Sequence, residues 1–201
     1  MFLGDNMKVS IGVSNRHVHL TKEHLNVLFG DRYELEKKND LTQPGQYAST
    51  SVVTIKTSKS EISNVRVLGP TRNYTQVEIS KTDSYKLGLN PPVRNSGDLN
   101  GSEPITIIGP NGSVDVDSGC IIAARHIHLT EEHIKHYNLE GKETVNVKLN
   151  GEKGGIISNV YLKTSDEAFF ELHIDTDDAN AHLIKNGDIG EIIWLIRNLN
   201  I

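Results

Sequence analysis

Apolar and polar residues alternate in short runs along most of this 201-residue chain. Alternation with a period of two is typical of strands with one buried face, and Gly, Pro or Asn turns separate the runs. Many short strands with such turns and only short helices favour small β-barrels, so we predict a mainly β protein. The predicted strands are residues 8–13, 51–56, 62–68, 75–80, 105–108, 114–116, 121–124, 144–149, 159–162, 169–174 and 191–196.

Short helices are predicted where a capping residue precedes apolar positions at helical spacing. Thr21 and Thr130 are suitable N-caps, because each is followed by an acidic first turn and, later, by a glycine that can end the helix. We expect Asp83 and Asp177, each with the threonine before it, to cap two more. The predicted helical segments are residues 21–30, 82–88, 130–141 and 176–183.

The phrase Arg-His-aliphatic-His-Leu-Thr occurs twice, at residues 16–21 and 125–130. Residues two apart in a strand point to the same face, so each His-x-His places two imidazoles side by side. Neutral imidazole is the commonest protein ligand for zinc-like ions. One such pair alone is equally typical of an ordinary surface or barrel-mouth pair, but two copies in one frame favour chelation of a metal.

The similarity extends beyond the two phrases and indicates an internal duplication. Overlaying the two halves aligns residues 76–83 with residues 171–177 and places Glu78 opposite His173. Each half then offers two histidines and one further ligand-type residue. Two His with Glu, and three His, are the ligand sets of catalytic zinc sites that keep an open position.

Composition narrows the function classes. The 21 basic and 26 acidic residues are mixed and the net charge is −5, which excludes a general nucleic-acid-binding surface. No apolar run approaches the length of a membrane span or a signal peptide, so we expect a soluble, cytoplasmic protein. The single cysteine, Cys120, excludes an intrachain disulfide framework, and its apolar surroundings favour a buried small hydrophobe over a nucleophile.

Two local features allow more than one interpretation. Arg72 lies six residues before Glu78, where a guanidinium could bind phosphate bidentately, although an isolated arginine is more often a surface charge. His17-x-His19 followed by Glu23 and Gly30 resembles the first cupin motif. Against a cupin, Glu23 favours the dipole of a capped helix, and no Pro-x-Gly-x-x-His motif follows.

Seven stretches together resemble the phosphate propanoyltransferase family, the PduL-type phosphotransacylases associated with propanediol and other aldehyde-oxidising microcompartments. The resemblance covers residues 8–193 in the family's order. The stretches are residues 13–20, 43–47, 64–70, 75–80, 94–99, 123–128 and 173–177.

The resemblance implies a reversible reaction in which acyl-CoA and phosphate give acyl phosphate and CoA. It implies two β-barrels capped by short helices, with a dinuclear zinc site between them. Since the family's first strand pairs with the C-terminal barrel, the expected domains are residues 16–123 and residues 7–15 with 124–197. The implied partners are acyl-CoA or CoA, phosphate or acyl phosphate, and a second copy in a homodimer.

The resemblance also implies roles for particular residues. Arg72 matches the family's phosphate-binding arginine. One zinc would be held by His17, His19 and Glu78, and the other by His126, His128 and His173. Coenzyme A contacts would come from Ser14, Asn15, Arg16, Lys59, Arg66 and Asn180.

Microcompartment members carry an N-terminal targeting extension, whereas about seven residues precede the first predicted strand here. We therefore expect a freestanding cytoplasmic form working in acetate metabolism. The alternative is a protein of the microcompartment lumen, working in propanediol degradation, because a chain trimmed of its extension would look the same. No Ser-His-Asp or Cys-His set is evident, so direct attack by phosphate is favoured over an acyl-enzyme. The alternatives are a dinuclear metallohydrolase of CoA thioesters or phosphoesters, and a non-catalytic barrel with structural metal.

Overall fold

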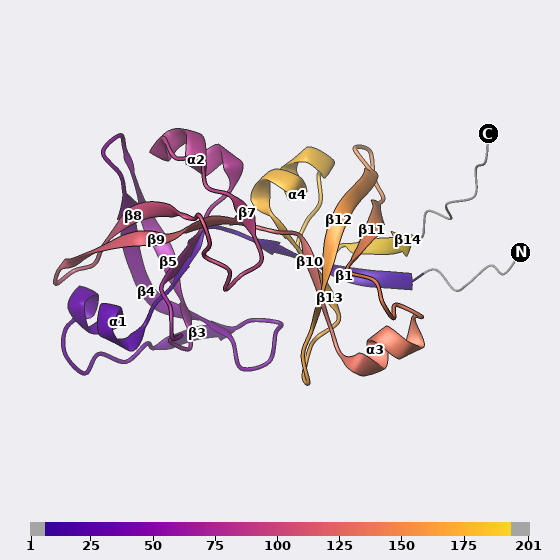
Figure 1. Ribbon diagram of the computed structural model, residues 1–201, viewed down its shortest axis with the longest axis horizontal. Helices are drawn as coiled ribbons and strands as arrows, with labels where there is room; N and C mark the ends of the chain where they lie inside the picture. Colours follow the sequence, from indigo (N-terminus) through magenta and orange to yellow (C-terminus); the bar gives the residue numbers. More distant parts are fainter. Residues whose placement is uncertain (1–6, 194–201) are drawn as a thin grey trace, which may run out of the picture. The chain divides into compact units, whose positions relative to one another are not determined.

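A computed structural model describes residues 7–193 of the chain (Figure 1). The helices are α1 (Lys22–Phe29), α2 (Lys81–Leu87), α3 (Glu131–His136) and α4 (Thr176–His182). The first nine strands are β1 (Met7–Ser14), β2 (His17–His19), β3 (Lys37–Asp40), β4 (Tyr47–Lys56), β5 (Glu61–Gly69), β6 (Gln76–Glu78), β7 (Val93–Arg94), β8 (Glu103–Ile108) and β9 (Ser113–Ala123). The remaining strands are β10 (His126–Leu129), β11 (Thr144–Leu149), β12 (Gly155–Thr164), β13 (Glu171–Asp175) and β14 (Ile189–Ile193).

The described chain divides into two compact units. We call residues 15–123 the central unit, and residues 7–14 together with 124–193 the terminal unit. In Figure 1, α1 and α2 lie on opposite sides of the strands of the central unit, and α3 and α4 do the same in the terminal unit.

The two units contain the same six-stranded closed barrel. The terminal barrel has the order β1-β13-β10-β12-β11-β14, closed by pairing of β14 with β1. The central barrel has the order β9-β6-β2-β5-β4-β8, closed by β8 with β9, while β3 and β7 flank this ring. Parallel and antiparallel pairings match at every step. The predicted fold class, mainly β with two small duplicated barrels and short helices, is confirmed.

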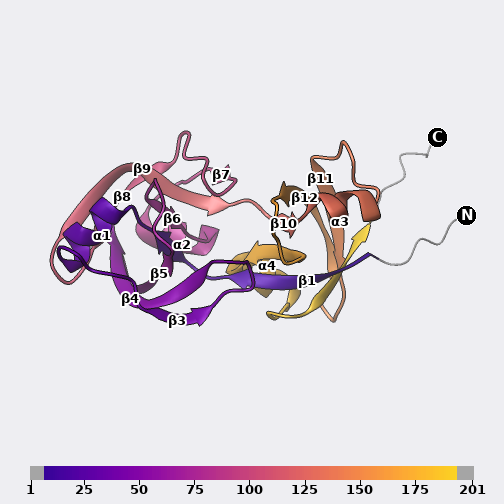
Figure 2. The same cartoon turned by 90° about the horizontal axis from the view of Figure 1, so that it is seen from below.

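The strand before each His-x-His strand belongs to the other unit. β1 leads directly into β2 of the central unit, but it pairs with β13 and β14 of the terminal unit. Conversely, β9 leads into β10 of the terminal unit but closes the central barrel against β6 and β8. Figure 2 shows β1, in indigo, among the strands of the terminal unit and β9, in pink, among those of the central unit.

Strand alternation separates each core from the histidines. Val18, between His17 and His19, is fully buried in the central apolar core, and Ile127 is fully buried in the terminal core. Because side chains alternate along a strand, the imidazoles lie on the opposite face of β2 and β10. In each His-aliphatic-His triplet, the aliphatic residue therefore packs in the barrel core, and the two histidines point away from the barrel interior.

Both barrels also contain a matching β-bulge. Asn64 and Asn159 have left-handed backbone angles, with φ of 60° and 57°, and the pairing register shifts beside each. Asparagine tolerates this conformation better than most non-glycine residues. The shared bulge is the structural counterpart of the Ser-Asn-Val tripeptide found in both halves.

Several predicted boundaries are wrong. Ser80 and Asp175, rather than Asp83 and Asp177, are the N-caps of α2 and α4, because each preceding strand runs directly into its helix. Helix α3 ends at His136, well before the predicted glycine stop.

Two strands were not predicted, β3 and β7, both of which flank the barrel ring. β3 is wholly exposed and β7 has only two residues, so neither carries an apolar alternation. The last three residues of the strand predicted at 191–196 lie outside the described residues. Within residues 7–193, no helix combines the length and apolar character needed to cross a membrane.

Candidate metal centres

The first candidate centre joins β2 to β6 in the central unit. His17 is the direct cross-strand partner of Glu78, and His17 Nε2 lies 3.4 Å from Glu78 Oε2. His17 Nδ1 lies 2.8 Å from the carbonyl oxygen of Asn15. Since a carbonyl can only accept, Nδ1 carries a proton in this hydrogen bond, and Nε2 is the ring nitrogen that faces Glu78. With His19, these side chains form a buried group whose ligand atoms lie within 4.8 Å of one another.

The second candidate centre joins β10 to β13 in the terminal unit at the same register. His126 is the direct partner of His173, as His17 is of Glu78. His126 Nδ1 is 2.8 Å from the carbonyl oxygen of Ala124, and its Nε2 is 3.1 Å from Nε2 of His128. The ligand atoms of these three histidines also lie within 4.8 Å of one another.

The donor sets fit a metal such as zinc. Ligand atoms around a tetrahedral zinc lie about 3.3 Å apart, given bonds of about 2.0 Å. The distances of 3.4 Å in the central unit and 3.1 Å in the terminal unit are close to that separation. Hydrogen bonds from Nδ1 to backbone carbonyls fix the tautomer that leaves Nε2 available, as is usual for metal-binding histidine.

The two centres differ in electrostatics. Burial by itself would raise the pKa of Glu78, but the nearby His17 and His19 outweigh it and lower that pKa. The same pairing raises the pKa of His17, against the effect of its own burial. In the terminal unit, burial, followed by the neighbouring His126 and His173, lowers the pKa of His128 to about 2. The central centre therefore pairs a carboxylate with imidazole, whereas His128 in the terminal centre is a neutral imidazole.

Arg72 is connected to the central centre through side chains. Its Nη1 donates to the hydroxyls of Tyr74 at 2.8 Å and Ser96 at 3.3 Å. Ser96 also accepts a hydrogen bond of 2.9 Å from Nε2 of Gln76. The same amide nitrogen donates to Glu78 Oε1 at 2.6 Å. One network thus holds the half-buried guanidinium and the carboxylate of the candidate centre.

The predicted coenzyme A residues do not form one cluster within a unit. Ser14 and Asn180 belong to the terminal unit, and Asn15, Arg16, Lys59 and Arg66 to the central unit. Lys59 is exposed and its Nζ donates to the carbonyl of Tyr85 at the end of α2. Arg66 donates to the carbonyls of Ser49 and Thr50 on β4.

The arginine of each repeated phrase is held by a helix. Arg16 binds both carboxylate oxygens of Asp83 on α2, at 2.7 and 2.8 Å. Arg125 binds both oxygens of Asp178 on α4, at 2.7 and 2.6 Å. These bidentate pairs fix the chain immediately before each His-x-His strand. Sequence reasoning identified neither aspartate as the partner of an arginine, although each is the third residue after the N-cap in its half.

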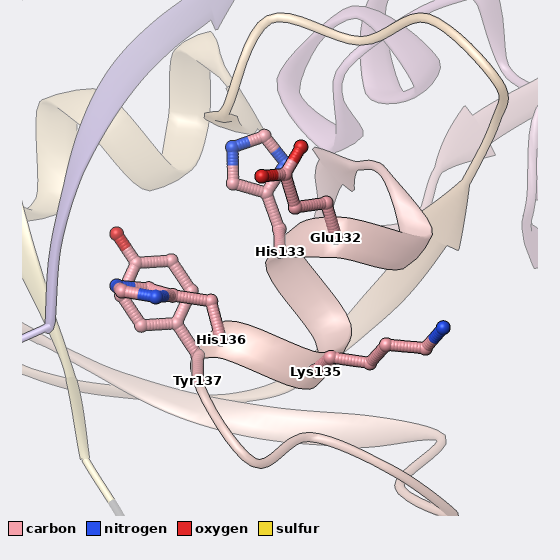
Figure 3. Close-up of a pocket in the computed structure, with 5 residues that line it drawn as sticks. All are labelled: Glu132, His133, Lys135, His136 and Tyr137. Carbon is pink, nitrogen blue, oxygen red and sulfur yellow. The ribbon is translucent and has the colours of Figure 1, made fainter.

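Two other features of the described residues lie outside the candidate centres. Cys120 is buried on β9, and burial, with smaller effects of Glu103 and Asp83, raises the pKa of its thiol to about 12, which confirms that it packs as a small hydrophobe. A pocket of about 660 Å³ lies along α3, and Figure 3 shows the side chains that line it. One of its residues, His133, stacks on Phe170 and accepts from the Thr130 backbone, as part of a helix cap. The pocket is lined by Glu132, His133, Lys135, His136 and Tyr137.

Comparisons with known proteins show which family the chain matches. A family model described as phosphate propanoyltransferase matches residues 10–185. The chain is 48% identical to a phosphate propanoyltransferase of Thermotoga maritima over 186 residues, covering 92% of this chain and 89% of that protein. It is 49% identical to one of Priestia megaterium over 182 residues, covering 90% and 84%. It is 44% identical to one of Rhodopseudomonas palustris over 188 residues, covering 94% and 83%.

Proposed function

Because the chain belongs to the phosphate propanoyltransferase family, and is therefore an acyltransferase, we propose that it works with two zinc ions. The proposed reaction transfers a propanoyl or acetyl group reversibly between coenzyme A and phosphate. The observation that carries the metal part of the proposal is the pair of candidate centres, which occupy the same register of two matching barrels.

Each unit would bind one ion. The ligands proposed for the central ion are His17, His19 and Glu78, and those for the terminal ion are His126, His128 and His173. Both sets leave room for a further ligand in a tetrahedral site, which is typical of catalytic rather than structural zinc. Imidazole and carboxylate also suit cobalt, nickel or iron, so metal analysis has to identify the ion.

When bound, zinc would supply Lewis-acid polarisation of the thioester and stabilise the departing thiolate. The chain's own residues would bind and orient the phosphate. Arg72 would bind phosphate oxygens through its planar guanidinium and offset their charge. Ser96 and Gln76 support that role, because their hydrogen bonds hold Arg72 and Glu78 in one network.

We further propose that phosphate attacks the acyl carbonyl directly. The single thiol, Cys120, is buried and has a pKa of about 12, so it is not ionised at neutral pH. The experiment is incubation with radiolabelled acyl-CoA without phosphate, followed by denaturation. We expect no label on the protein, and an acylated side chain would refute direct attack.

The coenzyme A contacts proposed from the family are Ser14, Asn15, Arg16, Lys59, Arg66 and Asn180. The Arg16 guanidinium is already bonded to Asp83, so it would contact the ligand only with its remaining donors. Lys59 and Asn180 are exposed, which leaves them accessible to the phosphates and the pantetheine arm of a large ligand.

The test is a panel of acyl-CoA thioesters assayed with and without phosphate, on protein whose metal content is measured. The proposal predicts thiol release that requires phosphate and yields an equal amount of acyl phosphate. A hydrolase of CoA thioesters would instead release thiol without phosphate. Protein that contains no metal as purified and gains no activity with added zinc would contradict the metal assignment. Sedimentation of the same sample tests the expected homodimer.

A further inference from the structure

Opposite each His-x-His motif, the strand that supplies the third ligand carries one carboxylate, but at a different position in each barrel. The two same-face residues paired with the motif are Gln76 and Glu78 on β6, and Glu171 and His173 on β13. The register is identical, because Gln76 and Glu171 are the partners of the second histidine of each pair, His19 and His128. The carboxylate has therefore moved by one same-face position between the two barrels.

Glu171 is positioned beside the terminal centre and not at the surface. It is only 2% exposed, and its Oε2 lies 2.7 Å from Nε2 of His173. A buried carboxylate is costly unless it is hydrogen-bonded and near positive charge. Glu171 is thus a buried carboxyl group in contact with one of three clustered imidazoles.

The neighbouring strand leaves space for this contact. Gly12 on β1 is the cross-strand partner of His173. A Cβ atom at Gly12 would lie 3.0 Å from Glu171 Cδ and Oε2 and 3.0 Å from His173 Cδ2. Because Gly12 has no side chain, there is room beside it for Glu171 and His173 to be in contact.

We propose that Glu171 is the carboxylate of the terminal metal centre: it orients His173 by a hydrogen bond and supplies the negative charge that Glu78 supplies in the central unit. This inference rests on the proposed metal sites. Glu171 is a positioning residue, because it acts through His173 rather than on the substrates. A carboxylate that holds a ligating histidine fixes the ring and raises its basicity, so it strengthens metal binding.

The test is Glu171→Gln, which keeps the shape of the side chain and removes its charge. Metal affinity is measured by competition with a chelator, and each site is followed by the visible absorption of bound Co²⁺. We expect one ion to bind as in the original protein and the other to bind about 10- to 100-fold more weakly. The matched control is Glu191→Gln, a carboxylate of the same unit that lies 3.8 Å from Lys148 and is expected to leave both affinities unchanged.

A double variant, Glu171→Gln with His173→Glu, reproduces on β13 the order found on β6. We expect it to recover most of the affinity that Glu171→Gln alone loses. Equal affinity of both sites in Glu171→Gln, or no recovery in the double variant, would overturn the inference. The inference would also be overturned if the metal-free Glu171→Gln protein had a much lower melting temperature and an unchanged metal affinity. That result would mean that Glu171 stabilises the fold and does not support metal binding. If the unsubstituted protein binds no metal, the proposed function fails instead.

Discussion

The central and terminal units share a barrel topology and differ in how each barrel is completed and in the residues of its candidate centre. The central barrel is formed by one continuous stretch, residues 15–123, whereas the terminal barrel needs β1 from the far end of the chain. Their third ligand-type residues are Glu78 and His173. Duplication has kept the register of the strands while the chemistry changed at two positions of one strand.

The largest expected difference between the units is in independent folding. A fragment of residues 15–123 contains all six strands of its barrel and is predicted to fold by itself. A fragment of residues 124–201 lacks β1, and with it the core side chains Val9 and Ile11, which are 1% and 0% exposed. Circular dichroism and amide exchange of the two fragments measure this. Cooperative unfolding of the second fragment would show that β1 is dispensable.

The candidate centres should be equally necessary for catalysis. We expect His17→Ala and His126→Ala each to lose one equivalent of metal and about 10³-fold in activity, because a metal ion supplies several kcal/mol of transition-state stabilisation. Both variants should remain folded, since each barrel core lies on the opposite face of the strand. Activity within tenfold of the original in either variant would mean that only one centre is catalytic, and unfolding would favour structural metal.

The phosphate site should belong to the central unit alone. Six residues before the third ligand-type residue, the central unit has Arg72 and the terminal unit has the exposed Glu167. We expect Arg72→Ala to lower kcat/KM for phosphate about 100-fold, through loss of a bidentate charged contact, with little change in KM for CoA. Steady-state kinetics with each substrate varied separately measure this, and Glu167→Ala is the control. An unchanged phosphate dependence would remove Arg72 from the site.

The smallest expected difference concerns the two arginine–aspartate pairs. The Asp83 side chain is 7% exposed and that of Asp178 is 20% exposed, while their arginines are about equally exposed. We expect Asp83→Asn to lower the free energy of unfolding by about 2 kcal/mol and Asp178→Asn by about 1 kcal/mol, because solvent screens the ion pair less where the carboxylate is more deeply buried. Urea unfolding provides the measurement. Equal losses would mean that burial does not distinguish the pairs.

Much of the fold and of both candidate centres was predictable, because the relevant signals are local. Alternating apolar residues indicated most barrel strands, and Thr21 and Thr130 were correctly predicted as helix caps. The third ligand-type residues were found because duplication aligned Glu78 with His173, and the structure pairs each with the first histidine of its motif. The caps Ser80 and Asp175 were missed, since a strand that runs directly into a helix has no turn residues to mark the boundary.

The sequence by itself determined the element types, the duplicated His-x-His strands and the residues able to bind metal, since periodicity and residue chemistry act over a few positions. Periodicity could not show which barrel β1 and β9 close, because strands pair whatever their separation in the sequence. For β1 only the family resemblance implied it, and the tertiary structure pairs β1 with β13 and β9 with β6. The tertiary structure also decided that Arg16 binds Asp83, 67 residues away, and that Arg72 reaches Glu78 through Ser96 and Gln76. The contact between Glu171 and His173 depends in the same way on β1, whose Gly12 leaves room for both side chains.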